Sequence, residues 1–317
     1  MKVVVQIPCL NEEKTLPLVL ESMPKKIPGV DVVEVLVIDD GSDDKTREIA
    51  AKYGVQHFVV HPRRKGLARS FHDGIMKALD MGADIIVNTD GDNQYPQERI
   101  ADLVQPIIRH EADIVIADRQ VAKIAHFSPG KKLMQKVGTK VLNLAAGTNV
   151  PDAPSGFRAY SRDAAMQLNV VTRFSYAMET IIQAGNKNLS IVSVPIETNP
   201  KTRESRLFKS SWEHIRKSGV AITRAFIMYR PYVFFLTLGL LLFLAGAVLF
   251  GRFLYLFLFE DHEASGHVQS LILGAVLLVG SFISFAMGII ADLIRINRTL
   301  TEDLLEQIKH TRFDKQK

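Results

Sequence analysis

The sequence predicts an α/β domain with a mainly parallel sheet, followed by two transmembrane helices. Three observations lead to this fold class. Apolar, β-branched runs alternate with helix-like segments through the first 120 residues, as in βαβ units with a buried parallel sheet. Polar clusters follow these runs where strands would end. Beyond residue 230 lie two long apolar runs, so the 47% of hydrophobic residues is unevenly spread along the chain.

The alternation near the N-terminus can be assigned to strands and helices. Strand-like runs are rich in Val and Ile, whereas helix-like segments repeat apolar residues at three- and four-residue spacing. The expected strands are 2–8, 33–40, 56–61, 83–90 and 112–119. The expected helices are 13–23, 43–53, 66–80 and 97–109, the second with Ser42 or Asp43 as its N-cap.

The two apolar runs, at about 232–257 and 268–291, each exceed the ~20 residues that a helix needs to cross a bilayer. Their connecting loop has no Lys or Arg, whereas basic residues flank the pair on both outer sides. These flanking residues are Arg216, Lys217, Arg224 and Arg230 before the first run and Arg295 and Arg298 after the second. The positive-inside rule therefore predicts an integral membrane protein whose soluble domain and both termini are cytoplasmic.

Four parts make up the predicted chain. They are a soluble domain at 1–206, an interfacial amphipathic region at 207–230, two spans within 231–292 and a charged amphipathic tail at 293–317. The tail is a candidate for pairing with a second copy in a homo-oligomer. A single cysteine, Cys9, excludes an internal disulfide and fits a reducing cytosol, and the apolar start of the chain is too short for a signal peptide.

The net charge of +5 fits a protein beside an anionic membrane leaflet. Nucleic acid is the other partner that basic charge suggests, but the sequence contains no nucleic-acid-binding module and we expect no such partner. Phosphate-binding loops of the GxxxxGK[ST] and GxGxxG kinds are also missing from the sequence, and the histidines show no zinc-site spacing. A bound nucleotide would need a metal and basic side chains to neutralise its phosphates.

Polar clusters follow four of the predicted strands: "CLNEE", "DDGSDD", "DGDNQ" and "DRQ". Ligands of open α/β sheets bind at the carboxyl ends of strands, and carboxylates crowded there would repel one another without a cation. Asp90 and Asp92 offer hard oxygen ligands to Mg²⁺ or Mn²⁺, and Gln94 offers a carbonyl oxygen on the same turn. The alternative interpretation is a solvated polar turn that ends a strand.

Five segments stand in a characteristic order: "IPCLNEE", "VIDDGSDDKT", "RKGLARSFHDG", "NTDGDNQYP" and "PSGFRAYSR". In order and spacing they resemble family 2 glycosyltransferases of the GT-A fold, a Rossmann-like α/β architecture. More closely, the chain resembles the polyprenyl-phosphate glycosyltransferases, which include dolichyl-phosphate mannose synthase and undecaprenyl-phosphate glucosyltransferases. The resemblance covers roughly residues 2–210, and two C-terminal spans are also familiar in that group.

The resemblance implies a site for the nucleotide and its metal. The base and ribose pocket is assigned to Pro8, Asn11, Glu12, Asp39 and Asp40, with Asp90 partly on the ribose. Gly66 would let the backbone close over the nucleotide, because glycine adopts conformations that other residues resist. The metal motif is assigned to Asp90, Asp92 and Gln94. The ion would bridge the donor diphosphate and stabilise its growing negative charge.

The resemblance also implies an acceptor site. Asp152 precedes an acceptor loop that contains Ser155, Gly156 and Arg158, and it is either a general base or an orienting group. A turn-capping role for Asp152 is the structural alternative. Arg119, Arg203 and Arg206 are candidates to bind the donor diphosphate and the lipid phosphate. The family has a basic residue followed by Gly-x-Ser-Lys where this chain reads "RESRLFKS", so the choice between Arg203 and Arg206 stays open.

Two segments mix basic and apolar positions at helical spacing. The segment 207–228 is predicted as an interfacial helix that leads into the first span, with Trp212 and Phe226 as anchors. The segment 131–146 places Leu133, Val137, Val141 and Leu144 near one face. For this second segment, membrane contact and packing inside the soluble domain are equally compatible with the sequence.

The resemblance and the residues together predict an inverting, metal-dependent transfer of a hexose. The donor would be a nucleotide diphosphate sugar such as UDP-glucose or GDP-mannose, and the acceptor dolichyl or undecaprenyl phosphate at the cytoplasmic membrane face. One alternative is a processive polysaccharide synthase, although the chain lacks a QxxRW-like motif and further spans. The other is a non-catalytic adaptor that binds nucleotide sugars at the membrane.

Overall fold

The computed structural model describes residues 1–121, 129–170, 176–200, 227, 230–259 and 268–313. The chain divides into two compact units, Met1–Ile222 with Glu302–Lys317, and Thr223–Thr301. The predicted domain boundary at 206, and almost all of the predicted interfacial segment 207–230, lie outside the described residues.

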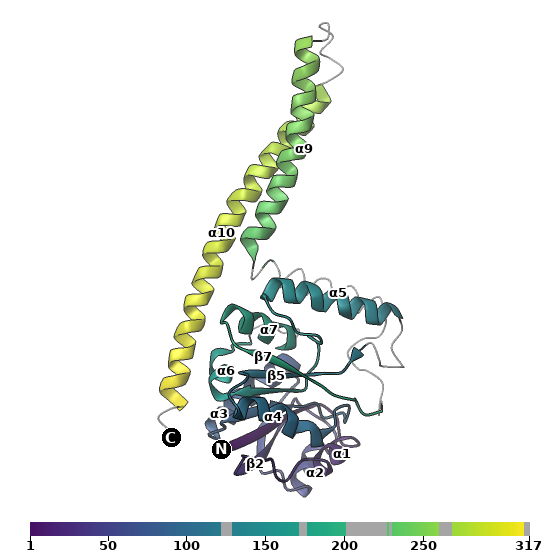
Figure 1. Cartoon of the computed structure of the whole chain (residues 1–317), viewed down its shortest axis with the longest axis vertical. Coiled ribbons are helices and arrows are strands. Elements are labelled where there is room, and N and C mark those ends of the chain that lie inside the picture. The colour runs from purple at the N-terminus through teal and green to yellow at the C-terminus, as the bar shows by residue number, and fades with distance from the viewer. Residues whose placement is uncertain (122–128, 171–175, 201–226, 228–229, 260–267, 314–317) are drawn as a thin grey trace. The chain divides into compact units, whose positions relative to one another are not determined.

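A seven-stranded sheet forms the centre of the first unit, in the order β3-β2-β1-β4-β6-β5-β7 (Figure 1). Its strands are β1 (Lys2–Cys9), β2 (Val32–Asp39), β3 (His57–Val60), β4 (Ile85–Asn88), β5 (Ile114–Asp118), β6 (Arg158–Ser161) and β7 (Ile191–Pro195). All pairings are parallel except those of β6 with β4 and β5. The five predicted strands are β1 to β5, so the predicted α/β fold with a mainly parallel sheet is confirmed.

The four predicted helices are present but shorter than expected. The helices of this unit are α1 (Leu16–Glu21), α2 (Thr46–Lys52), α3 (Leu67–Asp80), α4 (Ile100–Ile108, after the 3₁₀ turn η1, Gln97–Arg99), α5 (Pro129–Ala146), α6 (Arg162–Gln167) and α7 (Tyr176–Asn186). The predicted N-cap of α2 is wrong. Lys45 occupies that position, because Ser42 and Asp43 instead bond to the backbone and side chain of Asn11.

Successive residues of the central strand β1 face opposite sides of the sheet, as the pleat requires. Val3, Val5 and Ile7 share one buried cluster with apolar residues of α1, α2 and α4. On the other side α3 packs so closely that Gln6 fills the space that a side chain at Gly74 would need. Two helical layers therefore cover the sheet and leave its carboxyl-terminal edge for the loops.

Strand β6 brings a distant part of the chain to that edge. It pairs antiparallel with both β4 and β5, with Arg158 opposite Asn88 and Ile116. Because β6 runs against its neighbours, the loop that precedes it lies where the parallel strands end. Residues 152–157 therefore join the loops that follow β1, β2 and β4.

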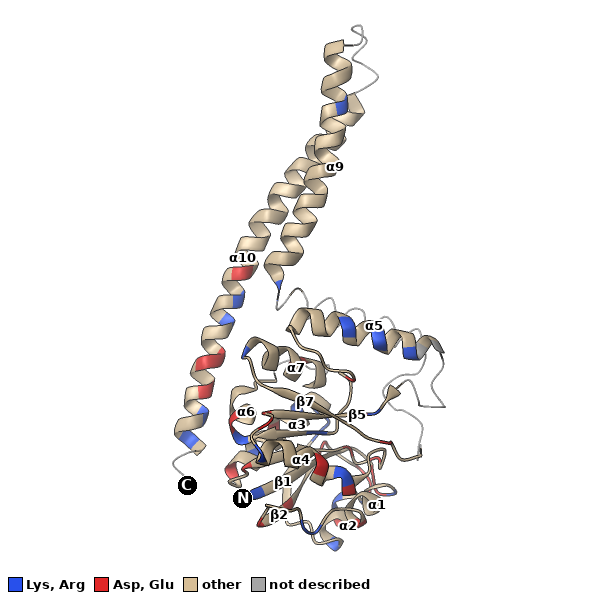
Figure 2. Ribbon diagram, viewed as in Figure 1, with Lys and Arg blue, Asp and Glu red and all other residues tan. Residues whose placement is uncertain are grey.

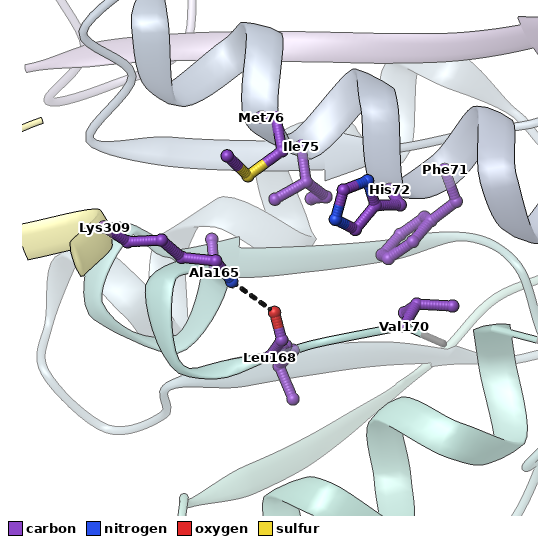
Figure 3. Close-up of a pocket in the computed structure, with 8 residues that line it drawn as sticks. All are labelled: Phe71, His72, Ile75, Met76, Ala165, Leu168, Val170 and Lys309. Carbon is purple, nitrogen blue, oxygen red and sulfur yellow. Dashed lines mark hydrogen bonds between the residues drawn. The ribbon is translucent and has the colours of Figure 1, made fainter. Parts of the chain in front are cut away.

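The last residues of the C-terminal helix α10 (Val268–Phe313) belong to the first unit. Figure 3 shows the buried side chain of Lys309 beside α3 and α6, in the lining of a small cavity with Phe71 and Met76. Its Nζ donates hydrogen bonds to the carbonyl oxygens of Met166, at 3.0 Å, and Leu168, at 2.8 Å. The amine thus binds carbonyl groups that the end of a short helix leaves without partners in the helix.

We expect Lys309→Met to destabilise this unit by about 1–3 kcal/mol, because two buried carbonyl groups lose their hydrogen-bond donor. Urea unfolding of the full-length protein in detergent measures the change. Lys52→Met is the matched control, since Lys52 is exposed in the last turn of α2 and its loss should change stability little. Equal effects of the two substitutions would contradict a role for Lys309 in holding this helix end.

The second unit contains two helices that are long and apolar enough to cross a membrane. Helix α9 (Pro231–Phe259) and helix α10 have mean hydropathies of 2.7 and 2.3 in their most apolar windows. Two serines of α10 donate hydrogen bonds to carbonyl oxygens of α9. Ser281 donates to Gly239 and Ser284 to Phe235, each at 2.8 Å. Such serine and glycine contacts are typical of helix pairs in bilayers. The predicted tail from 293 continues α10 without a break to Phe313.

Candidate active site

Loops from β1, β2 and β4, and the loop before β6, meet at the carboxyl-terminal edge of the sheet. The acidic turn after β4 occupies the middle, since β4 lies between β1 and β6. Asp90 and Asp92 are both half-buried on this turn. The backbone amide of Gln94 lies 3.3 Å from one oxygen of Asp92, and its side-chain Nε2 donates to the other at 2.8 Å. Gln94 thus holds the Asp92 carboxylate.

The acidic turn packs directly on the end of β1. A β-carbon on Gly91 would lie 3.0 Å from the Sγ of Cys9 and 3.3 Å from the Cγ of Glu12, so glycine fits where a side chain would crowd. The hydroxyl of Thr15 lies 2.7 Å from Glu12 and 2.8 Å from the Gly91 carbonyl oxygen. Burial, with the charges of Glu12 and other carboxylates, raises the pKa of the Cys9 thiol well above its ordinary value.

The loops after β1 and β2 are tied together by side chains at the predicted nucleotide pocket. Asn11 adopts a left-handed conformation with φ of 56° and binds both Ser42 and the amide of Asp43. Asp39 is buried at 1% exposure, accepts a hydrogen bond from the amide of Ser42 at 2.9 Å and forms an ion pair with Arg47 at 3.0 Å. The carboxyl ends of β1 and β2 therefore bring together the predicted pocket residues Pro8, Asn11, Glu12 and Asp39.

Asp40 faces the loop that leads into α3. Its two carboxylate oxygens accept hydrogen bonds from the amides of Lys65 and Gly66, each at 2.8 Å, and one also lies 2.8 Å from Nδ1 of His61. Gly66 has φ of 95°, a conformation that favours glycine, and the space beside its α-carbon is open. Asp40 therefore holds the Gly66 loop in place.

Arg119, directly after β5, forms a two-point ion pair with Asp152. Its Nε and one terminal nitrogen donate to the two oxygens of Asp152 at 2.7 and 2.8 Å, and its backbone amide adds a third bond at 3.1 Å. The two side chains are 14% and 1% exposed. Burial disfavours the charged form of Arg119, but the hydrogen bonding and charge of Asp152, with the charge of Asp90, outweigh burial and raise the pKa of Arg119 above its ordinary value. The guanidinium thus keeps its charge.

The peptide of Gly156 connects the acidic turn to the loop before β6. Its amide donates to the hydroxyl of Tyr95 at 3.0 Å, and its carbonyl oxygen accepts from the side chain of Asn88 at 2.8 Å. A β-carbon on Gly156 would lie 3.1 Å from Oδ2 of Asp90 and 2.8 Å from the hydroxyl of Tyr176. The predicted acceptor-loop residue Gly156 and the predicted metal ligand Asp90 are therefore in direct contact.

Two other residues of the predicted acceptor loop are fully buried. Arg158 is 0% exposed, and its guanidinium donates to the carbonyl oxygens of Ser155, Ala153 and Ala177 at 2.6–2.8 Å. Arg158 therefore lies in the interior, where its hydrogen bonds to the loop carbonyl groups stabilise the loop. Ser155 is equally buried, and among the described residues its hydroxyl has no hydrogen-bond partner. Arg203 and Arg206 lie outside the described residues.

Three side chains of this site were not predicted from the sequence: Tyr95, Tyr176 and Asn88. Asn88 had a visible signal, since it is a polar residue at the end of the apolar strand β4, and Gln6 interrupts the apolar strand β1. The two residues are register partners, and Gln6 donates to Asn88 at 2.9 Å. Tyr95 follows the acidic motif directly. Tyr176 carried no signal, because its place depends on the packing of α7 against α3.

Residues 4–168 of the chain match glycosyl transferase family 2. The chain belongs to this family. It is 32% identical over 221 residues to the low-salt glycan biosynthesis hexosyltransferase Agl6 of Haloferax volcanii, a match that covers 67% of this chain and 52% of the relative. The chain thus spans about half the length of that relative.

Another relative of this family 2 glycosyltransferase is nearer to it in length. An undecaprenyl-phosphate mannosyltransferase of Micrococcus luteus is 29% identical over 206 residues, with 62% of this chain and 83% of the relative covered. The fold is similar to that of glucosyl-3-phosphoglycerate synthase from Mycobacterium tuberculosis in complex with Mn²⁺, UDP and phosphoglyceric acid. That likeness has a TM-score of 0.54 and 21% identity, covers 71% of this chain and 77% of the other, and confirms the GT-A-like fold alone.

Proposed function

We propose that this family 2 glycosyltransferase moves a hexose from a nucleotide diphosphate sugar to a polyprenyl phosphate, with inversion at the sugar. The observation that carries the proposal is the contact between the acidic turn and the acceptor-side loop, where Asp90 lies against Gly156. Arg119, directly after β5, pairs with Asp152 of that same loop. The names of the relatives from Haloferax volcanii and Micrococcus luteus support a hexose and a lipid phosphate.

The acidic turn fits a divalent cation. Asp90 and Asp92 supply two carboxylates from one turn, and the described residues contain no cluster of three His, Cys, Asp or Glu side chains that would enclose an ion. Few protein carboxylates, completed by phosphate oxygens and water, are the usual environment of Mg²⁺ or Mn²⁺ in sites of this kind. Such an ion, when bound, would neutralise the charge that develops on the diphosphate as the sugar leaves.

The chain's own residues around that turn would bind and orient the donor. Pro8, Asn11, Glu12 and Asp39 would line the base and ribose pocket, with Asp90 partly on the ribose. Gln94 would hold Asp92 in position through two hydrogen bonds from its nitrogen atoms to that carboxylate, and its side-chain carbonyl oxygen would be a further ligand of the cation. Asp40 would act indirectly: it accepts hydrogen bonds from the amides of Lys65 and Gly66 and so would hold that loop beside the nucleotide.

Arg119 and Asp152 would serve the acceptor. A phosphate monoester is already ionised near neutral pH, so its oxygen can attack the anomeric carbon without giving up a proton, and the nucleoside diphosphate leaves from the opposite face. Asp152 would then orient Arg119 instead of removing a proton, and the remaining N–H groups of Arg119 would bind the acceptor phosphate. Fixed cationic donors of this kind stabilise charge best when they need no rearrangement during the reaction.

Charge flanking the apolar helices supports a cytoplasmic catalytic unit. Arg230 precedes α9, Arg295 and Arg298 follow the apolar part of α10, and residues 260–267 contain no Lys or Arg. By the positive-inside rule, the start of α9 and the end of the apolar part of α10 would then lie on the cytoplasmic side. We therefore propose an integral membrane protein that takes its lipid acceptor from the cytoplasmic leaflet.

Helix α5 is a second membrane element in this proposal. Leu133, Val137 and Leu144 are 64%, 53% and 69% exposed on it, whereas Leu142 and Ala145 are buried on its other side. The helix carries four lysines and no acidic residue, and Figure 2 shows basic residues along it. An exposed apolar stripe among lysines suits the interface of an anionic bilayer.

We expect serine at Leu133, Val137 and Leu144 together to raise the apparent KM for polyprenyl phosphate in anionic liposomes by ~10-fold, because apolar area that enters the bilayer is lost. Transfer to a short-chain acceptor in detergent should change little. Leu18→Ser in α1, also at an exposed apolar position, is the control. Equal loss with both acceptors would argue against membrane contact by α5.

A transfer assay tests the function directly. The full-length protein in detergent is incubated with Mn²⁺, a short polyprenyl phosphate and either UDP-glucose or GDP-mannose, and the lipid product is analysed for one added hexose. Undiminished transfer in excess chelator would overturn the metal-dependent mechanism. Products with several sugars would favour the polysaccharide synthase alternative, and nucleotide binding without transfer to any acceptor would favour the adaptor.

A further inference from the structure

Tyr176 occupies a buried position beside the acidic turn that the proposed chemistry does not use. It is the first residue of α7 and is 2% exposed. Its ring stacks on Phe71 of α3, with ring centres 4.1 Å apart and planes inclined by 10°. Its hydroxyl accepts a hydrogen bond from Nδ2 of Asn88 at 2.9 Å and lies 3.4 Å from the carbonyl oxygen of Gly156. The phenol is therefore fixed both by its ring and by its oxygen.

The hydroxyl of Tyr176 and the carboxylate of Asp90 both lie close to the position that a side chain on Gly156 would occupy. A β-carbon on Gly156 would meet the hydroxyl at 2.8 Å and Oδ2 of Asp90 at 3.1 Å. A tyrosine hydroxyl is neutral near pH 7, so it adds no charge repulsion beside the carboxylate and fills space that the carboxylate would otherwise reach.

The side-chain amide of Asn88 is fixed in orientation by its hydrogen bonds. Its Oδ1 accepts a hydrogen bond from Nε2 of Gln6 at 2.9 Å, which leaves the Nδ2 group for Gly156 and Tyr176. Gln6 is itself 0% exposed and is packed against Gly74 of α3. A buried chain of polar side chains thus runs from the central strand β1 to the edge of the acidic turn. Buried hydrogen bonds in series restrict the arrangements that their members can adopt.

Residues before and after the acidic turn both form hydrogen bonds with the peptide group of Gly156. Asn88 lies two residues before Asp90, and Tyr95 follows Gln94; they bind the carbonyl and the amide of Gly156 respectively. The separation between the turn and the Gly156 loop is therefore set by the hydrogen bonds of one peptide group. Tyr176 is the contact to that peptide that comes from outside both loops.

We propose that Tyr176 is a positioning residue for the acidic turn: its hydroxyl, held by Asn88, fixes Gly156 against Asp90 and so sets the direction in which Asp90 presents its carboxylate. This inference rests on the proposed function, in which Asp90 and Asp92 receive the cation of the donor diphosphate. Loss of a group that supports a metal-binding side chain typically weakens affinity for the ion.

The test is Mn²⁺ binding by the full-length protein in detergent, measured by calorimetry and by the loss of the free Mn²⁺ electron spin resonance signal, with saturating UDP and separately GDP. Tyr176→Phe keeps the stacked ring and removes only the hydroxyl. We expect Mn²⁺ binding ~3–10-fold weaker, the effect of one lost hydrogen bond, with a thermal unfolding midpoint close to that of the wild type. Gly156→Ala, which forces a methyl group between Asp90 and the hydroxyl, should weaken binding at least as much.

Tyr160→Phe is the matched control. Tyr160 is 0% exposed, and its ring packs edge-on against the same Phe71 at 5.7 Å. We expect its Mn²⁺ affinity to be that of the wild type. Unchanged Mn²⁺ affinity in a folded Tyr176→Phe protein, or equal losses in both tyrosine variants, would overturn the positioning role and leave the proposed function standing. If the wild type binds no Mn²⁺ with either nucleotide, the proposed function fails, and this inference fails with it.

Discussion

Asparagine in place of Asp92 is expected to lower hexose transfer by about 10³-fold while the protein stays folded. An ion that stabilises the leaving diphosphate contributes several kcal/mol to the barrier, and each 1.36 kcal/mol is tenfold in rate. Asparagine keeps the size of the side chain but removes the charge that would hold the ion. Because Asp92 is only half-buried and its carboxylate bonds to Gln94 within the same turn, folding should depend on it little.

Steady-state transfer at a range of Mn²⁺ concentrations measures this effect, with thermal unfolding measured alongside. Asp31→Asn is the control, since that carboxylate is 83% exposed and precedes β2, at the opposite edge of the sheet. Full activity of Asp92→Asn at ordinary Mn²⁺ concentrations would refute the assignment of this turn as the metal site. Recovery of activity at much higher Mn²⁺ would support it, because a weakened site can still be filled.

The sequence was sufficient to predict the part of this site that lies on parallel strands. Runs of Val and Ile locate β1 to β5, and polar residues directly after them must lie at one edge because parallel strands end together. Asp90 and Asp92 could therefore be placed at that edge from the order of the residues alone. The same reasoning did not give the side-chain partners of Asp40, whose oxygens bind the Gly66 loop.

The other half of the site depends on β6, which the sequence did not reveal. The strand reads "RAYS", without the Val and Ile residues that mark β1 to β5, and it enters the sheet between two strands that are neighbours in sequence order. Only its antiparallel direction brings Asp152 and Gly156 to the active edge. The pairing of Arg119 with Asp152, 33 residues apart, has no local signal for the same reason.

The buried amides carry a signal that is visible in the sequence. Gln6 interrupts the apolar strand β1, Asn88 ends the apolar strand β4, and a buried amide requires hydrogen-bond partners. In adjacent parallel strands each is the nearest candidate for the other. The Gln6–Asn88 part of the network around Tyr176 could thus have been predicted. The position of Tyr176 itself depends on the packing of α7 on α3, which the sequence does not indicate.

The second large effect is expected at the ion pair of Arg119 and Asp152. Asparagine at Asp152 should destabilise the unit by about 3 kcal/mol, because it leaves the guanidinium of Arg119 buried without its counter-charge. Transfer should fall by at least ~100-fold, the usual cost of misplacing a group that stabilises charge in the transition state. Urea unfolding and transfer assays on the same preparation measure the two losses.

A double variant separates the structural part of this effect from the chemical part. Replacing the pair by apolar residues, as Arg119→Met with Asp152→Leu, removes both buried charges and should restore most of the lost stability. Activity should stay low, because no cation remains for the acceptor phosphate. Recovery of activity together with stability would show that the pair only supports the fold.

The pH dependence of transfer decides between the two roles of Asp152. If Asp152 orients Arg119, the acceptor phosphate needs no proton removed, and Asp152→Asn should lower the rate by the same factor at every pH where the phosphate is ionised. If Asp152 were a general base, the variant would lose most where the wild type is most active and would recover as hydroxide took over. A constant ratio of wild-type to variant rates from about pH 6.5 to about pH 9 is our expectation. The two bonds of 2.7 and 2.8 Å that bind the carboxylate to Arg119 are the reason.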